Sequence, residues 1–157
     1  SESVVTVSAL DEESGVMRRL FHKSYRPGQD ESLVDDLVEI RQRFGVQRVV
    51  VDDCPAGQFM INRMERLGWD VVRMNFRRDK VAKYGAFRSA MHKGLVESYS
   101  DDDLLEEMLA LEKEPSRQRS RIGPAQGYSD DLIDSWVMSC YSFLEDGQGF
   151  RSWFDEL

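Results

Sequence analysis

Two groups of carboxylates are the residues of this sequence best suited to chemistry. Asp52 and Asp53 directly follow the apolar run 49–51. A second group comes much later, after Gly127 and Tyr128, and comprises Asp130, Asp131 and Asp134. Carboxylate oxygens are the ligands that hard divalent cations prefer in proteins. Metal ions held this way activate water and neutralise charge on phosphate, so the two groups predict phosphate-ester cleavage.

Each group also has a purely structural interpretation. Asp52 or Asp53 could cap the loop before Gly57, and strand alternation sends the two side chains to opposite faces, so at most one enters a given site directly. Acidic residues in a first helical turn are favoured by the helix dipole alone. Asp134, however, lies within an apolar helical stripe, where an unpaired carboxylate is costly. A bound cation would remove that cost.

Composition restricts the classes of protein to consider. The chain has 157 residues, which is typical of one domain over 1–157, and its apolar runs are too short to span a membrane. The net charge of −8 argues against a generic nucleic-acid coat protein, which would be basic. Cys54 and Cys140 have no framework or CxxC spacing, so we expect two reduced cysteines in a cytosolic protein.

Basic side chains nevertheless cluster locally. Lys80 and Lys83 are expected to share a helical face, and the segment 115–126 is expected to be a polar loop or a small hairpin. Most charge runs are solvated faces, but these clusters could also contact phosphates. The candidates for contact with DNA are Arg77, Arg78, Lys80, Lys83, Arg117, Arg119 and Arg121.

The apolar pattern predicts the elements that would position these residues. Residues 4–10 and 16–25 are predicted to form a β-hairpin, a helix follows from Asp30 to Gly45, and 47–52 is predicted to be an inner strand. The further predicted elements are helices over 57–67, 81–93 and 101–114, strands over 69–75 and 95–99, and a last helix capped by Ser129. The predicted core aromatics are Phe59, Phe87, Trp136 and Phe143. The order predicts an α/β domain with a mixed sheet flanked by helices.

Three segments resemble the C-terminal nuclease domain of the large terminase subunit of tailed bacteriophages. They are residues 49–57, 83–96 and 127–134, in the same order and spacing over most of the chain. The last, Asp-Asp-Leu-Ile-Asp opening a helix after Gly-Tyr, is the most specific. The resemblance implies an RNase H-like fold in which clustered carboxylates bind two Mg²⁺ or Mn²⁺ ions. The implied catalytic and metal ligands are Asp52, Asp130 and Asp131, with Asp134 as an additional ligand.

The same resemblance implies a biological role. The family cuts concatemeric double-stranded viral DNA during packaging, in the host cytoplasm, together with a packaging ATPase domain, the portal and the small terminase subunit. Because no base-reading motif is visible, we expect cleavage with little sequence specificity. No GxxxxGK[ST] motif occurs in the 157 residues, so they do not contain the ATPase motor.

One residue that the resemblance implies has no counterpart here. The family's first catalytic Asp lies on a strand before the hairpin, and no Asp occupies that position. Asp11 is the nearest candidate, but it lies in the predicted turn at the far end of a strand. We expect the sequence to be a fragment that lacks the first strand; the alternative is an incomplete site.

Two other functions compete with a nuclease. Acidic residues at strand ends also form the Mg²⁺-assisted phosphoacceptor pocket of receiver-like modules. A receiver, however, has its acidic pair after the first strand, whereas Asp52 and Asp53 follow a hairpin and a helix. The second alternative is a catalytically silent docking or regulatory domain of the packaging motor, which a nuclease assay with Mn²⁺ distinguishes.

Overall fold

A long β-hairpin forms the middle layer of the molecule. The computed structural model describes residues 2–46, 48–114 and 121–145. Strand β1 (Ser3–Leu10) pairs antiparallel with β2 (Met17–Tyr25), and the short strand β5 (Val96–Ser98) adds to β2 in parallel. This three-stranded sheet is therefore mixed, as the sequence predicts.

Two smaller sheets accompany the hairpin. Strand β3 (Arg48–Asp52) pairs in parallel with β4 (Asp70–Met74), and β6 (Leu111–Glu114) pairs antiparallel with β7 (Arg121–Pro124). The expectation that β3 is an inner strand is wrong for the described residues, because β3 is hydrogen-bonded to β4 alone. The apolar pattern reports burial but not which strands share backbone hydrogen bonds, so it cannot predict this division.

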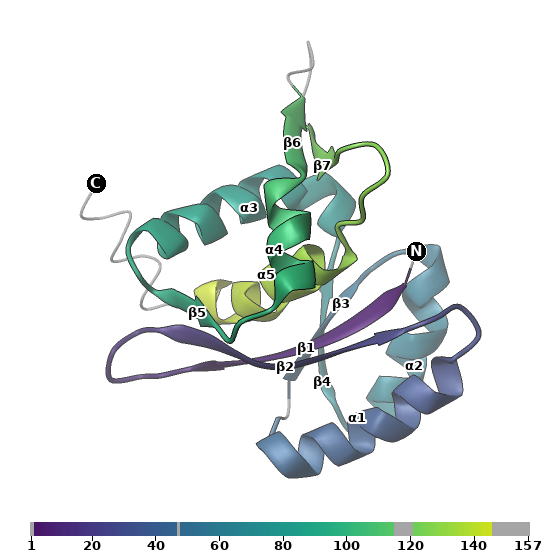
Figure 1. Cartoon of the computed structure of the whole chain (residues 1–157). Coiled ribbons are helices and arrows are strands. Elements are labelled where there is room, and N and C mark those ends of the chain that lie inside the picture. Colours follow the sequence, from purple (N-terminus) through teal and green to yellow (C-terminus); the bar gives the residue numbers. More distant parts are fainter. Residues whose placement is uncertain (1, 47, 115–120, 146–157) are drawn as a thin grey trace.

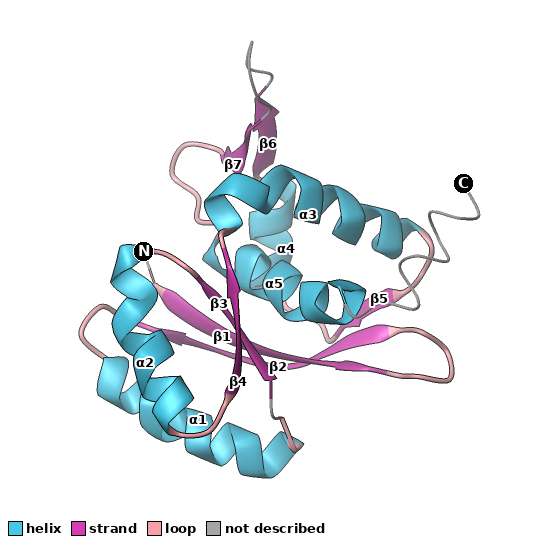
Figure 2. Cartoon of the chain, turned by 180° about the vertical axis from the view of Figure 1, so that it is seen from behind, coloured by secondary structure: helices cyan, strands magenta, loops and turns pink. Residues whose placement is uncertain are grey.

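Helices cover the sheets from two sides (Figures 1 and 2). Helices α1 (Asp30–Phe44) and α2 (Gln58–Arg66) lie on one side, with the short 3₁₀ turn η1 (Pro55–Gly57) before α2. Helices α3 (Phe76–His92), α4 (Asp102–Leu109) and α5 (Asp131–Glu145) lie on the other. No helix in the described ranges is long and apolar enough to cross a membrane. The architecture is a mixed α/β fold, which confirms the predicted fold class.

Two separate cores hold the layers together. On the α1–α2 side, Leu33, Leu37 and Met64 pack with Tyr25 and Trp69. On the other side, α3, α4 and α5 pack around a cluster that also includes Met17 of β2. Its buried members include Phe76, Tyr84, Phe87, Leu104, Ile133, Trp136, Val137 and Cys140. Helix α5 thus lies directly on the hairpin, which places its first turn near the start of β1.

Three predicted element details are corrected by the structure. Helix α3 begins at Phe76 rather than at 81, because the Asn75 side chain accepts a hydrogen bond from the Arg78 amide (2.9 Å) and caps the helix. Helix α4 ends at Leu109 rather than at 114, because residues 111–114 pair with β7. Phe59 is not a core residue, since α2 turns it outward.

We predict that Phe59 and Ile61, which lie two residues apart on α2, differ sharply in their contribution to the free energy of unfolding. Ile61 is 0% exposed, so Ile61→Ala should lower the free energy of unfolding by about 2–5 kcal/mol. Phe59 is 54% exposed, so Phe59→Ala should cost less than about 1 kcal/mol despite removing more atoms. Urea unfolding followed by circular dichroism measures both, and equal losses would contradict this orientation of α2.

Candidate functional site

Asp52 is the last residue of β3, at the carboxyl edge of the parallel β3–β4 pair. Its Oδ1 accepts a hydrogen bond from the Phe76 amide at 3.0 Å, so the carboxylate lies at the N-terminus of α3, where the helix dipole favours negative charge. A side chain at Gly57 would place its Cβ 2.9 Å from the Asp52 carbonyl oxygen, so the close approach of the following loop requires glycine there. Asp53, the neighbouring carboxylate, is exposed.

Asp130 and Asp134 converge on one cation from α3. The Lys80 Nζ lies 2.6 Å from Asp130 Oδ2 and 3.0 Å from Asp134 Oδ1. The Tyr84 hydroxyl donates to the same Asp134 Oδ1 at 2.5 Å. The Asp130 and Asp134 side chains retain 21% and 22% exposure, so the pair is reachable from solvent. This cluster joins α3 to the first turn of α5.

Burial and charge oppose each other within this cluster. Burial raises the pKa of Asp134, although the Tyr84 hydroxyl and the Lys80 ammonium favour its ionised form. Burial alone would lower the pKa of Lys80, but the two carboxylates outweigh it and raise the pKa. Burial and the neighbouring Asp134 charge raise the pKa of Tyr84. The cluster therefore contains a charged lysine, and Tyr84 stays a hydroxyl donor at neutral pH.

The first turn of α5 is held by two further side chains. The Ser129 hydroxyl accepts a hydrogen bond from the Asp131 amide (3.1 Å), but the first backbone bond of α5 runs from the Asp134 amide to the Asp130 carbonyl, so Ser129 lies one residue before the capping position that the sequence predicts for it. Glu107 of α4 is buried and accepts a hydrogen bond from the Ile133 amide at 3.0 Å. Burial raises the pKa of Glu107, while hydrogen bonds with the Ile133 amide, the Ser129 hydroxyl and the Leu132 amide favour its ionised form. Asp131 itself turns toward β1, where its Oδ2 accepts a hydrogen bond from the Glu2 amide (3.0 Å).

Helix α3 is the element that relates the two acidic groups. Phe76, Lys80 and Tyr84 follow at i, i+4 and i+8 and so share one helical face. The Phe76 amide holds Asp52, while Lys80 and Tyr84 hold the α5 carboxylates. The Lys80 ammonium also lies over the Phe76 and Tyr84 rings, at 5.8 and 5.5 Å from their centroids. Helix α3 thus holds a carboxylate of β3 at its N-terminus and the carboxylates Asp130 and Asp134 through its side chains.

The residues fit a cation in part. Asp130 and Asp134 already point at one positive centre, the Lys80 ammonium, so their oxygens are placed as two ligands of a cation. Within residues 2–46, 48–114 and 121–145, however, no three Asp, Glu, His or Cys side chains come close enough to hold a metal ion. The arrangement is a two-carboxylate cation position with Asp52 and Asp131 held outside it.

The predicted DNA-contacting residues have different surroundings. Arg77 and Arg78 are exposed in the first turn of α3, where Arg78 pairs with Asp79 at 2.9 Å. Lys80 is instead directed at the carboxylates. Lys83 has different surroundings from Lys80: its residue is 4% exposed, and its Nζ lies 4.0 Å from Asp79 Oδ2. Arg117 and Arg119 lie outside the described residues, and the backbone of Arg121 begins β7.

Lys80, Tyr84 and Glu107 are the site residues whose part the sequence alone does not reveal. The sequence predicts Lys80 to face DNA and the other two only to be helical. Glu107 has a detectable signal, because it falls on the stripe of α4 that also carries Leu104 and Met108. Tyr84 occurs at i+4 from Lys80, but only the packing of α3 on α5 shows which residues they contact.

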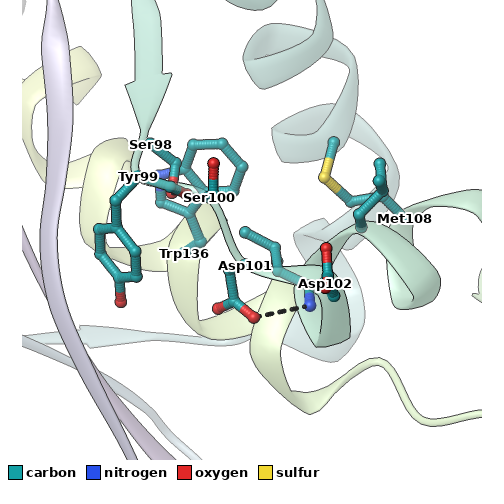
Figure 3. A pocket seen from close by; sticks show the side chains of 9 residues that line it. Ser98, Tyr99, Ser100, Asp101, Asp102, Met108 and Trp136 are labelled. Carbon is teal, nitrogen blue, oxygen red and sulfur yellow. Dashed lines mark hydrogen bonds between the residues drawn. The ribbon is translucent and has the colours of Figure 1, made fainter.

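The hollow beside α4 is not lined by these carboxylates. A hollow of about 260 Å³ borders α4 and is lined by Ser98, Tyr99, Ser100, Asp101, Asp102, Leu104, Leu105, Met108 and Trp136 (Figure 3). Behind it, the buried Arg19 pairs with Asp101 at 2.8 Å and lies over the Tyr99 ring at 4.8 Å. This ion pair fixes the β5–α4 connection to β2, so we interpret it as structural. The carboxylate cluster itself is partly buried, with Asp130 and Asp134 reachable from solvent.

Solved structures show what this arrangement is similar to. No protein-family model and no curated protein sequence matches the chain. The large terminase nuclease from thermophilic phage G20c aligns with a TM-score of 0.73 and 15% identity, over 89% of this chain and 81% of that chain. The Thermus phage P74-26 large terminase nuclease domain aligns with a TM-score of 0.64 and 14% identity, over 94% and 82%. The chain has the fold of a phage large terminase nuclease domain.

This result confirms the RNase H-like fold expected from the sequence. The G20c nuclease has also been solved with bound magnesium, and that structure aligns with a TM-score of 0.72 and 15% identity, over 90% of this chain and 82% of that chain. Other structures of the G20c nuclease contain cobalt or zinc. The terminase-like fold thus occurs in a nuclease that takes divalent metals.

We predict that the Tyr84 hydroxyl contributes to stability through Asp134. Tyr84→Phe removes a donor from a largely desolvated carboxylate, so the free energy of unfolding should fall by about 1.5–3 kcal/mol. Tyr128→Phe is the matched control, because Tyr128 is 49% exposed and the change should cost less than about 0.5 kcal/mol. Thermal unfolding at pH 7 compares them, and equal effects would argue against this hydrogen bond.

Proposed function

We propose that this chain is a metal-dependent DNA endonuclease domain of a viral packaging terminase. The observation that supports the proposal is that α3 holds Asp52 at its N-terminus and Asp130 and Asp134 through Lys80 and Tyr84, within a terminase nuclease fold. The fold by itself hosts no particular chemistry. These carboxylates supply acidic oxygens of the kind that the chemistry needs, and Asp130 and Asp134 are reachable from solvent.

The proposed ligands are the carboxylates predicted from the sequence. Asp130 and Asp134 would hold a divalent cation, Mg²⁺ or Mn²⁺, and Asp52 and Asp131 would complete a two-ion site after a change of side-chain position. When bound, the ions supply water activation and neutralisation of the charge that develops on the phosphate. The Phe76 amide orients Asp52, and the Tyr84 hydroxyl holds Asp134 in place.

The proposed substrate is concatemeric double-stranded DNA, cut with little sequence specificity. The exposed Arg77 and Arg78 lie in the first turn of α3, beside the Phe76 amide that binds Asp52, and so place positive charge next to the site. Arg117, Arg119 and Arg121 are the other proposed contacts with DNA. The burial of Lys83 removes it from this set. The packaging ATPase domain, the portal and the small terminase subunit are the proposed partners, in the host cytoplasm.

Replacing either Asp52 or its neighbour Asp53 by asparagine tests the proposed catalytic role of Asp52. In a chain extended by the first strand and its Asp that the resemblance implies, Asp52→Asn should abolish cleavage of supercoiled plasmid in Mg²⁺ or Mn²⁺, because a metal ligand is removed, whereas Asp53→Asn should retain it. Mn²⁺ should also raise the melting temperature of the wild type, since a ligand bound only by the native state stabilises it. No cleavage by this extended chain, and no shift with millimolar Mn²⁺, would favour the catalytically silent docking domain.

The basic segment gives a separate test of the substrate. The triple change of Arg117, Arg119 and Arg121 to Ala should weaken binding to any duplex sequence. The logarithm of the binding constant falls linearly with the logarithm of the salt concentration, and the slope should become shallower by about 0.9 for each phosphate contact that the triple change removes. Fluorescence anisotropy with a mixed-sequence duplex at several salt concentrations measures the slope, and Arg43→Ala on the remote α1 is the control. An unchanged slope would show that the segment does not bind phosphate.

A further inference from the structure

The ammonium of Lys80 occupies the position where the carboxylate pair would receive a metal. Its Nζ is 2.6 Å from Asp130 Oδ2, 3.0 Å from Asp134 Oδ1 and 3.1 Å from Asp134 Oδ2. The ammonium donates hydrogen bonds to Asp130 Oδ2 and Asp134 Oδ2, and Asp134 Oδ1 completes the ion pair. The side chain is only 16% exposed, and the Phe76 and Tyr84 rings flank its charge. Lys80 is therefore an ordered counter-ion and not a mobile surface lysine.

A divalent ion and this ammonium cannot occupy the pair together. An ion such as Mg²⁺ bonds carboxylate oxygens at about 2.0–2.1 Å, inside the volume that Nζ now fills. Two positive centres at such a separation also repel strongly in a partly desolvated site. Binding of metal between Asp130 and Asp134 thus requires Lys80 to withdraw.

Charge balance explains why a lysine stands there. Without a cation, Asp130 and Asp134 would repel each other, and Asp134 would be an unpaired carboxylate in a largely buried position. One ammonium leaves the trio at a net charge of −1, so a divalent ion, which neutralises both carboxylates, can still compete. The lysine keeps the two carboxylates together but neutralises only one of their two negative charges.

We propose that Lys80 is the resident counter-ion of this carboxylate pair and that a divalent cation binds only by displacing it. Lys80 therefore sets the affinity of the site for metal and keeps the first turn of α5 docked on α3 while metal is absent. The inference rests on the proposed metal-dependent function. The displaced ammonium stays tethered to α3, one turn from Phe76 and hence near the Asp52 end of the site.

The test measures Mn²⁺ affinity and metal-free stability rather than cleavage. Isothermal titration calorimetry and thermal unfolding are carried out on the wild type, Lys80→Met and Lys80→Gln. Lys23→Met is the control, because Lys23 also pairs with an aspartate, Asp36 at 2.7 Å, and also lies over a tyrosine ring. Lys80→Gln keeps two N–H donors without the charge, so it provides a folded variant if Lys80→Met is too unstable to measure.

Removal of the Lys80 charge should tighten Mn²⁺ binding by at least about tenfold, because the metal no longer displaces a cation. The metal-free melting temperature of Lys80→Met should fall below that of the wild type, and saturating Mn²⁺ should close the gap. Lys23→Met should leave Mn²⁺ affinity unchanged.

Two results would overturn the inference, and they are distinguishable. If the wild type binds Mn²⁺ and both Lys80 variants bind it equally or more weakly, Lys80 is a permanent structural partner and the proposed nuclease chemistry stands. If neither the wild type nor the variants bind Mn²⁺, the displacement and the metal-dependent function both fail.

Discussion

The desolvated carboxylate of Asp134 is the constraint around which this molecule is arranged. The side chain lies one residue from Ile133 and two from Trp136, both of which belong to the core of the α3–α5 side. A charge in that position is tolerated only when it is paired and hydrogen-bonded. Lys80 and Tyr84 provide the pairing, and both come from α3. The packing of α3 on α5 and the chemistry of the site therefore depend on the same interactions.

Helix α3 also carries the constraint to the other acidic group. Its N-terminus is capped by Asn75 and by the Asp52 carboxylate, so the end of β3 is tied to the helix that neutralises Asp134. A change in the position of α3 would alter both acidic groups at once. This coupling gives the pair of motifs, distant in sequence, a fixed spatial relation.

Helix α4 holds the first turn of α5 in place but contributes no carboxylate to the cluster of Asp130 and Asp134. Glu107 satisfies a backbone amide in the first turn of α5, and the Arg19–Asp101 pair ties the start of α4 to β2. Both are buried charged groups, whose cost is offset by defined partners. Rigid support of this kind is what a site needs when its ligands are clustered like charges that repel one another.

The sequence by itself determined the local elements and the chemical type of the site. The hairpin, most helices and the position of Asp52 at a strand end follow from period, capping and strand patterns, because these signals are local. The start of α3 and the outward turn of Phe59 do not follow from them, since a single cap residue and the choice of helix face outweigh a weak apolar pattern. The terminase resemblance predicts the fold that the solved structures confirm.

Only the tertiary structure decided how the carboxylates are partnered. That Lys80 faces Asp130 and Asp134 depends on the packing of α3 on α5, and that Asp131 turns to Glu2 depends on the packing of α5 on the hairpin. Neither arrangement is encoded in a local pattern, and the same is true of the burial of Lys83. Strand pairing was decided in the same way, because backbone hydrogen bonds between distant segments leave no mark on the sequence of either strand. A lysine that the sequence predicts to contact DNA thus becomes, once the helices pack, the counter-ion of the site.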